Sequence, residues 1–182
     1  MQRAPLLAAC AALLTATPGG DDAGDLDAVL AQIEADFDDY CESGALIWSP
    51  LILAQLAEGH LRAGRPDRAQ ATLDRAFARI ERSGERYWEA ELHRLRGDAL
   101  RAQDAPGDDV RRAYQQAADV ALVQSARALL LRAHAAGFAH APDAASRTRL
   151  MRTFDAFAEG HDTPDLTRVH SLLAKPERST EP

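Results

Sequence analysis

The residues best able to bind a metal ion in this 182-residue sequence are its six histidines. A metal site needs several ligands that converge, and two histidines four residues apart on one helix are a common arrangement. His134 and His140 are too far apart along the chain for this arrangement and do not share a helix face, and no HExxH motif occurs. We therefore expect no metal site, and we interpret His60, His93 and the other histidines as packing or surface residues.

Nucleophilic catalysis has equally little support. Ser49, Ser83 and Ser125 stand where helices are expected to begin, a position at which serine caps backbone N–H groups, and no GxSxG motif occurs. Cys41 lies beside Glu42, an acidic neighbour that opposes thiolate formation. Adjacent aspartates are interpreted as loop and helix-start charges. The sequence thus predicts no catalytic residue, no cofactor and no enzymatic activity.

Composition and charge limit the class of protein further. The net charge is −7 with no evident basic cluster, whereas nucleic-acid binding requires clustered positive charge, so we expect no direct nucleic-acid partner. Hydrophobic residues make up 46% of the chain but aromatic residues only 5%, and β-branched residues never form an alternating run. This composition favours closely packed helices rich in alanine and leucine, and predicts an all-α chain.

A repeated pattern supplies the elements that would position these residues. A Ser-Gly pair precedes Trp48, the same pattern recurs before Trp88, and a weaker third copy has Leu130 in the Trp place. A period of roughly 40 residues, as here, is typical of stacked helical repeats. Each unit is interpreted as a pair of helices, with Trp88 filling the interface between hairpins and Gly97 at a helix crossing.

Apolar residues at intervals of three and four predict where these helices lie. A first helix is expected over residues 25–40, then helical hairpins beginning at Ser49, at Trp88 and at Ala126, and a last short helix from Pro164. We predict an N-terminal helix remnant or signal-like segment plus loop over 1–24, a repeat domain over 25–174 and a disordered tail over 175–182. The fold prediction is a solenoid of about three full helical hairpins plus flanking helices.

The hairpin that begins at Ser49 fits the tetratricopeptide pattern of large, small and turn residues at fixed steps. Three blocks, 54–66, 84–98 and 157–166, together resemble the C-terminal tetratricopeptide region of large bacterial regulators. Such regulators carry an ATPase module, and many carry a class III adenylate or guanylate cyclase or a DNA-binding domain. The resemblance covers about residues 25–174, although the chain has no GxxxxGK[ST] phosphate loop. The residues that match the repeat pattern are Leu53, Leu56, Ala57, Gly64, Ala69, Leu73 and Ala76.

The resemblance implies a protein–protein interaction module, similar to the sensor or scaffold end of a signalling or transcriptional regulator. In tetratricopeptide arrays the first helix of each hairpin lines a concave groove that binds a protein or peptide partner. The alternative for this face is a solvated strip with helical charge pairs, Glu58 with Arg62 and Arg94 with Asp98, or stacking against a neighbouring domain. The expected groove residues are Leu51, Ala54, Glu58, Leu61, Arg62, Glu91, Arg94, Asp98 and Arg101.

The N-terminus leaves the location of the protein open. Residues 1–17 have the outline of a short signal peptide, and the sequence that ends at Cys10 has the outline of a lipoprotein cleavage site. The repeat pattern instead favours a helix of an earlier repeat near Ala8, one period before Trp48, and a cytoplasmic protein with free cysteines. Two alternatives remain: an exported lipoprotein-type module anchored at the membrane through lipidated Cys10, and a remnant of a cyclase or ATPase regulator without an independent role.

Overall fold

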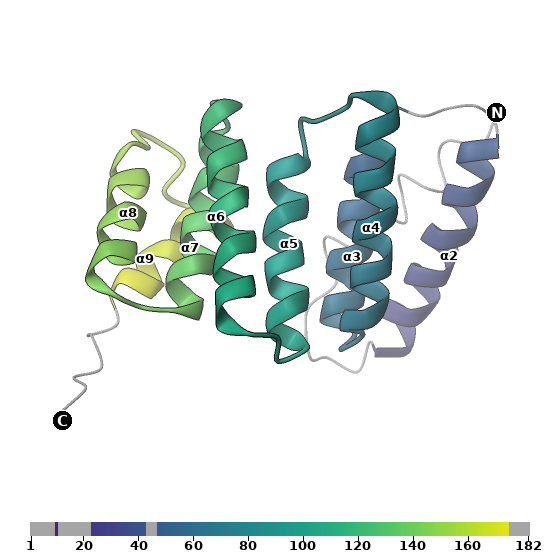
Figure 1. Cartoon of the computed structure of the whole chain (residues 1–182), viewed down its shortest axis with the longest axis horizontal. Helices are drawn as coiled ribbons and strands as arrows, with labels where there is room; N and C mark the ends of the chain where they lie inside the picture. Colours follow the sequence, from purple (N-terminus) through teal and green to yellow (C-terminus); the bar gives the residue numbers. More distant parts are fainter. Residues whose placement is uncertain (1–9, 11–22, 43–46, 175–182) are drawn as a thin grey trace.

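The computed structural model describes residue 10 and residues 23–42 and 47–174, and these form α-helices without any β-strand. The predicted all-α class is therefore confirmed for this part of the chain. The segments 1–9, 11–22, 43–46 and 175–182, which include most of the signal-like segment and the predicted tail, lie outside the described residues. Figure 1 shows helices arranged side by side, with α2 at one end and α8 and α9 at the other.

The helices of the described residues follow the order that the apolar spacing predicts. Proline occupies the first turn of α3, α4 and α9, where its missing N–H has no helical partner to lose. Glycines in the left-handed region, Gly84 among them, follow the ends of helices. The helices are α2 (Ala23–Glu42), α3 (Ser49–Arg62), α4 (Pro66–Ser83), α5 (Glu89–Ala102), α6 (Gly107–Val123), α7 (Arg127–His140), α8 (Ala144–Asp155) and α9 (Pro164–Leu173).

Each helix from α3 to α8 packs on the next one in the chain, most extensively within the pairs α3 with α4 and α5 with α6, while α7 packs on both α6 and α8. The first helices of these pairs also touch one another, since α5 contacts both α3 and α7. Among the described residues, by contrast, no Cα atoms of α4 and α6 come within 8 Å of each other. Helix α2 covers α3, and α9 packs on α7 and α8 (Figure 1). The first helices thus form the more closely packed layer.

The expected serine caps are wrong. Within the described residues, α3, α5 and α7 begin without a side-chain cap, because Trp48, Trp88 and Ala126 hold the cap positions. Ser49 is instead the fully buried first residue of α3. Ser125 lies one residue before Ala126, which holds the N-cap position of α7. The one complete capping box found among these helices is at α8, where Asp143 and Ser146 bond reciprocally.

The third repeat also differs from its expected register, in which Leu130 is the equivalent of Trp88. Helix α5 begins directly after Trp88, and α7 begins directly after Ala126. Ala126, not Leu130, therefore takes the place of the tryptophan that precedes the earlier helices. The difference arises because α6 ends at Val123 and the chain turns directly through Ser125, at φ 55°.

Two large apolar clusters lie toward opposite ends of the array. One joins α2 to α5 and contains Phe37, and the other joins α7, α8 and α9 around Leu131 and Leu150. Between them, smaller clusters of alanine with Val110 and Tyr114 connect α6 to α7, and we call these the alanine seam. The seam lets the helix backbones approach closely. It is defined by Val110, Tyr114, Ala117, Ala118, Ala133 and Ala136.

The predicted crossing at Gly97 is confirmed. A Cβ atom at this position would lie 2.4 Å from the Tyr114 ring, so only glycine fits. Trp88 is less central than expected, because it is only partly buried at the N-cap of α5.

Cys10 and Cys41 are free cysteines, and Cys10 is buried in the cluster that joins α2 to α5. Lipidation of Cys10 would therefore have to remove its side chain from this cluster. Across the described parts of the chain, no helix combines the length and apolar character that crossing a bilayer requires.

Candidate functional site

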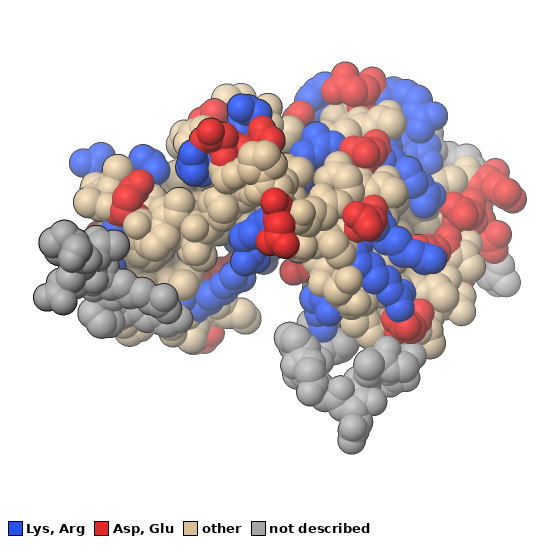
Figure 2. All heavy atoms as spheres, turned by 60° about the horizontal axis from the view of Figure 1, so that its bottom comes forward, with Lys and Arg blue, Asp and Glu red and all other residues tan. Residues whose placement is uncertain are grey.

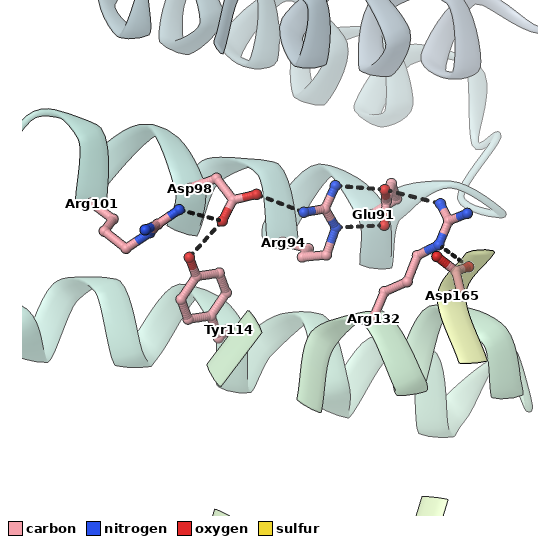
Figure 3. Close-up of polar contacts among 7 residues, drawn as sticks. All are labelled: Glu91, Arg94, Asp98, Arg101, Tyr114, Arg132 and Asp165. Carbon is pink, nitrogen blue, oxygen red and sulfur yellow. Dashed lines mark hydrogen bonds and ion pairs between the residues drawn. The ribbon is translucent and has the colours of Figure 1, made fainter. Parts of the chain in front are cut away.

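Two of the expected groove residues on α5, Glu91 and Arg94, form a buried ion pair. Glu91 and Arg94 are only 3% and 8% exposed, three residues apart on the same helix. Arg94 Nε and Nη2 donate to the two Glu91 carboxylate oxygens at 2.9 and 2.8 Å, a bidentate pair (Figure 3). A buried pair of this kind is tolerated because each charge satisfies the other.

Electrostatics within this pair favour both charged forms. Burial raises the pKa of Glu91, but the positive charges of Arg94 and Arg132 outweigh it, so the pKa of the carboxyl lies below its ordinary value. Burial likewise opposes the charge on Arg94, yet the neighbouring Glu91 raises the pKa of the guanidinium. Both groups are ionised at neutral pH.

A second carboxylate extends the chain of contacts toward the C-terminal end of α5. Arg94 Nη1 donates to Asp98 Oδ2 at 2.6 Å, and the Tyr114 hydroxyl from α6 donates to Asp98 Oδ1 at 2.6 Å. Arg101 Nη2 lies 3.8 Å from Asp98 and completes this end of the cluster (Figure 3). Burial first, and then the Asp98 charge, raises the pKa of Tyr114, so its hydroxyl remains a donor.

Arg132 on α7 connects the pair to the last helix of the array. Its Nη1 donates to Glu91 at 3.3 Å, and its Nε donates to Asp165 Oδ2 on α9 at 2.7 Å. The cluster therefore links α5, α6, α7 and α9, and its three carboxylates balance its three guanidinium groups. We call it the α5 ion network, formed by Glu91, Arg94, Asp98, Arg101, Tyr114, Arg132 and Asp165.

The remaining expected groove residues lie at different depths. On α3, Glu58 is exposed, and Ala54 is buried. On α5, Asp98 is partly buried and Arg101 is 60% exposed. The expected Arg94–Asp98 pair is present, but it is largely buried rather than solvated. The other α3 residues, all partly buried, are Leu51, Leu61 and Arg62.

Sequence reasoning did not find three members of the α5 ion network: Tyr114, Arg132 and Asp165. Each comes from a different helix, and no spacing rule joins residues that are so far apart along the chain. The available indication was Arg132 itself, a lone charge in the otherwise apolar run 128–131 and 133. A charge in such a run implies burial against a partner.

The histidines belong to the packing of the array. His60 is 1% exposed, and its Nε2 lies 3.1 Å from Glu34 on α2. His93 packs on the Phe77 ring with centroids 4.7 Å apart, and burial lowers its pKa to about 4. His134 Nδ1 lies 2.8 Å from the Thr153 hydroxyl. Among the described residues, no group of three or more potential ligands is placed to hold a metal ion.

A small cavity lies between α6, α7 and α8, with a volume of about 110 Å³. Arg111, His134 and Arg149 contribute to its lining. Cofactor and substrate pockets are commonly about 300–1,000 Å³, so this cavity suits no ligand of that size.

In comparisons with known proteins, no protein-family model, no curated protein and no solved structure matches this chain.

Proposed function

We propose that the chain is a non-catalytic protein–protein interaction module, built as a tetratricopeptide-like solenoid of about three full helical hairpins with flanking helices. It recognises a peptide or domain of a partner protein on the face formed by the first helices. It would act as the sensor or scaffold end of a bacterial signalling or transcriptional regulator. The extensive packing of α3 with α4 and of α5 with α6 supports a hairpin array.

The observation that carries the proposal is the difference between the two layers of helices. The first helices α3, α5 and α7 contact one another in series, whereas α4 and α6 remain apart in the described structure. An array whose helices lie closer together on one side than on the other curves toward that side. The molecular surface is hollowed in the lower middle of Figure 2, with acidic and basic side chains near the hollow. A hollowed surface of mixed charge suits recognition of a polar peptide.

The α5 ion network gives this face a fixed arrangement of charges. Because Arg94 is held by both Glu91 and Asp98, the outer groups of α5 are positioned before any partner arrives. Arg101 is the exposed cation of the cluster, and its long 3.8 Å pair with Asp98 leaves donors of the guanidinium available to a carboxylate of a partner. Complementary charge of this kind contributes selectivity more than affinity.

The test compares charge reversals at two exposed arginines, one on the first-helix face and one on α6. Arg101 on α5 and Arg112 on α6 are 60% and 68% exposed, and each pairs with an aspartate three residues earlier. The wild type, Arg101→Glu and Arg112→Glu are used as baits in lysate of the source cells, after circular dichroism confirms equal helicity. Each captured protein is then purified and its Kd for the three baits is measured directly.

We expect a partner that binds the wild type and Arg112→Glu equally and binds Arg101→Glu about tenfold more weakly, which corresponds to about 1.4 kcal/mol. Equal binding by all three baits would place the interaction elsewhere on the molecule. The absence of any captured partner would contradict an independent binding role. Arg94→Glu is unsuitable as the test, because it would place two like charges in a buried cluster.

A further inference from the structure

One end of the array, which lies at the top of Figure 1, gathers most of the exposed large hydrophobic residues of the described structure. They form an exposed apolar strip. Here α2, α4 and α6 end and α3, α5 and α7 begin. Five of the six large hydrophobic residues that are exposed in the described structure lie at this end, each between 43% and 88% exposed. Single exposed hydrophobic residues are common, but a group at one place indicates an interaction site. We call this strip the apolar edge, formed by Ile47, Trp48, Tyr87, Leu122 and Val123.

Contacts between hairpins make the apolar edge continuous. The rings of Trp48 and Tyr87 meet edge to face with centroids 6.1 Å apart, and the Tyr87 and Trp88 ring centroids are 6.5 Å apart. Gln124 Nε2 donates to the Arg86 carbonyl at 2.6 Å, which holds the end of α6 against the segment that carries Tyr87. The repeated tryptophans and the tyrosine therefore form a row of aromatic rings that continues toward the end of α6.

Trp48 has a backbone conformation that a large side chain rarely adopts. Its φ of 72° lies in the left-handed region, and Ser125 at the same end has φ 55°. Strained residues of this kind concentrate at functional sites. Here the strained backbone presents an indole ring to solvent, where burial contributes little to the stability of the fold. The conformation is thus unexplained by packing alone.

The polar atoms beside the apolar edge specify the chemistry of its occupant. Glu85 is only partly buried and forms no ion pair among the described residues, and burial first, then the Glu85 charge, raises the pKa of the neighbouring Tyr87 hydroxyl. A carboxylate beside an exposed aromatic ring favours a cationic occupant. The nearby cation Arg86 already pairs with Glu81 and Glu89. A carboxylate without an ion pair among the described residues therefore stands next to the exposed Tyr87 ring.

We propose that the apolar edge docks a short peptide segment of another protein in which arginine alternates with apolar residues. The planar guanidinium donates several hydrogen bonds and stacks on aromatic rings, so one arginine can pair with the Glu85 carboxylate and cover the Tyr87 ring. The apolar residues of the segment cover Trp48 and the end of α6. This surface is separate from the first-helix face and does not depend on the function proposed there.

The probe is a phage-displayed library of random dodecapeptides, selected on the full chain and counter-selected on Trp48→Gly. Glycine adopts φ 72° without strain, so this variant removes the ring and keeps the backbone. We expect enriched peptides with arginine between apolar residues. For a synthetic copy, fluorescence anisotropy should give a Kd about tenfold higher with Trp48→Gly, and about tenfold higher with Glu85→Gln, than with the wild type.

Two variants serve as controls. Met151→Ala removes the sixth exposed hydrophobic side chain, on α8 and outside the apolar edge, and should leave the Kd unchanged. Arg101→Glu should also leave it unchanged, which separates this site from the first-helix face.

Enriched peptides without basic residues, or equal binding by the wild type and Trp48→Gly, would overturn the proposal. So would sedimentation data in which the wild type is a dimer and Trp48→Gly a monomer, because a second copy of the chain would then occupy the edge.

Discussion

Replacement of Gly97 by alanine provides the sharpest test of how the hairpins pack. The added Cβ would lie 2.4 and 2.6 Å from two carbon atoms of the Tyr114 ring. The ring cannot simply turn away, because its hydroxyl is bonded to Asp98 and its face is buried in the alanine seam. Overpacking of this kind costs about 1–3 kcal/mol, and a contact this short belongs at or above the upper end.

An opposing effect reduces this cost slightly. Alanine is favoured over glycine in a helix interior by about 0.5–1 kcal/mol, so the net destabilisation of Gly97→Ala should be about 2 kcal/mol. For a chain of this length, that corresponds to a fall in Tm of about 4–8 °C. Urea denaturation followed by circular dichroism gives the free energy of unfolding, and a thermal scan gives the Tm.

Gly137 on α7 is a matched control, because it faces the same tyrosine from the other side. Its Cβ would lie 3.8 Å from Tyr114 Cβ, an ordinary contact. Gly137→Ala should therefore stabilise the protein by about 0.5–1 kcal/mol through helix propensity alone. Opposite signs for the two substitutions are the expected result.

A double-mutant cycle isolates the clash itself. In a Tyr114→Ala background the ring is absent, so Gly97→Ala should become stabilising by about 0.5–1 kcal/mol. Tyr114→Phe keeps the buried ring but loses its bond to Asp98, so Gly97→Ala should remain destabilising in that background at a reduced cost. If Gly97→Ala is at least as stable as the wild type with Tyr114 present, α5 and α6 do not cross at this glycine and the packing described here is incorrect.

Two further predictions concern charge. Glu91→Ala should destabilise the protein by about 3–5 kcal/mol in urea denaturation, because it leaves Arg94 buried without its bidentate partner. Glu58 is exposed, so Glu58→Ala should stay within about 0.5 kcal/mol of wild type. Similar losses for both variants would refute the buried pair. Burial, and then the Arg96 charge, lowers the pKa of His93 from 6.5 to about 4. Between these pH values the folded state binds fewer protons than the unfolded state. The neutral His93 therefore contributes fully to the free energy of unfolding above pH 6.5. This contribution is lost as the pH falls toward 4, by up to about 3 kcal/mol. Urea denaturation at several pH values gives the free energy of unfolding as a function of pH, and its dependence on pH should be weaker in His93→Phe than in the wild type. An unchanged pH dependence would contradict the lowered pKa of His93.

The sequence predicted the helices well because each carries its own local evidence. Proline marks the start of α3 and α9 within one residue of the expected positions, and apolar spacing locates the helices between them. The repeat pattern predicts a small residue at the helix crossing, and the 2.4 Å distance from a Cβ atom at Gly97 to the Tyr114 ring agrees with it. Such features depend on neighbours close in sequence or on the repeat itself.

Side-chain depth could not be predicted in the same way. The expected groove contained Glu91 and Arg94 as surface charges, and the structure buries both, because Arg132 and Asp165 arrive from distant helices to complete the cluster. A helical periodicity identifies which residues share a face, but not what covers that face. The serine caps were wrong for a related reason, since Ser49 is drawn into the core and the cap position passes to Trp48.

The alanine seam has a consequence for how the protein unfolds. The two large apolar clusters are joined through the small side chains of the seam, and the Arg132–Glu91 bond crosses the same boundary from α7 to α5. Each half thus has a core of its own, and the ion pair adds to the packing of α6 on α7 in coupling them. Cooperativity between them should depend on the ionisation of Glu91, so that acid uncouples the halves before it melts either one.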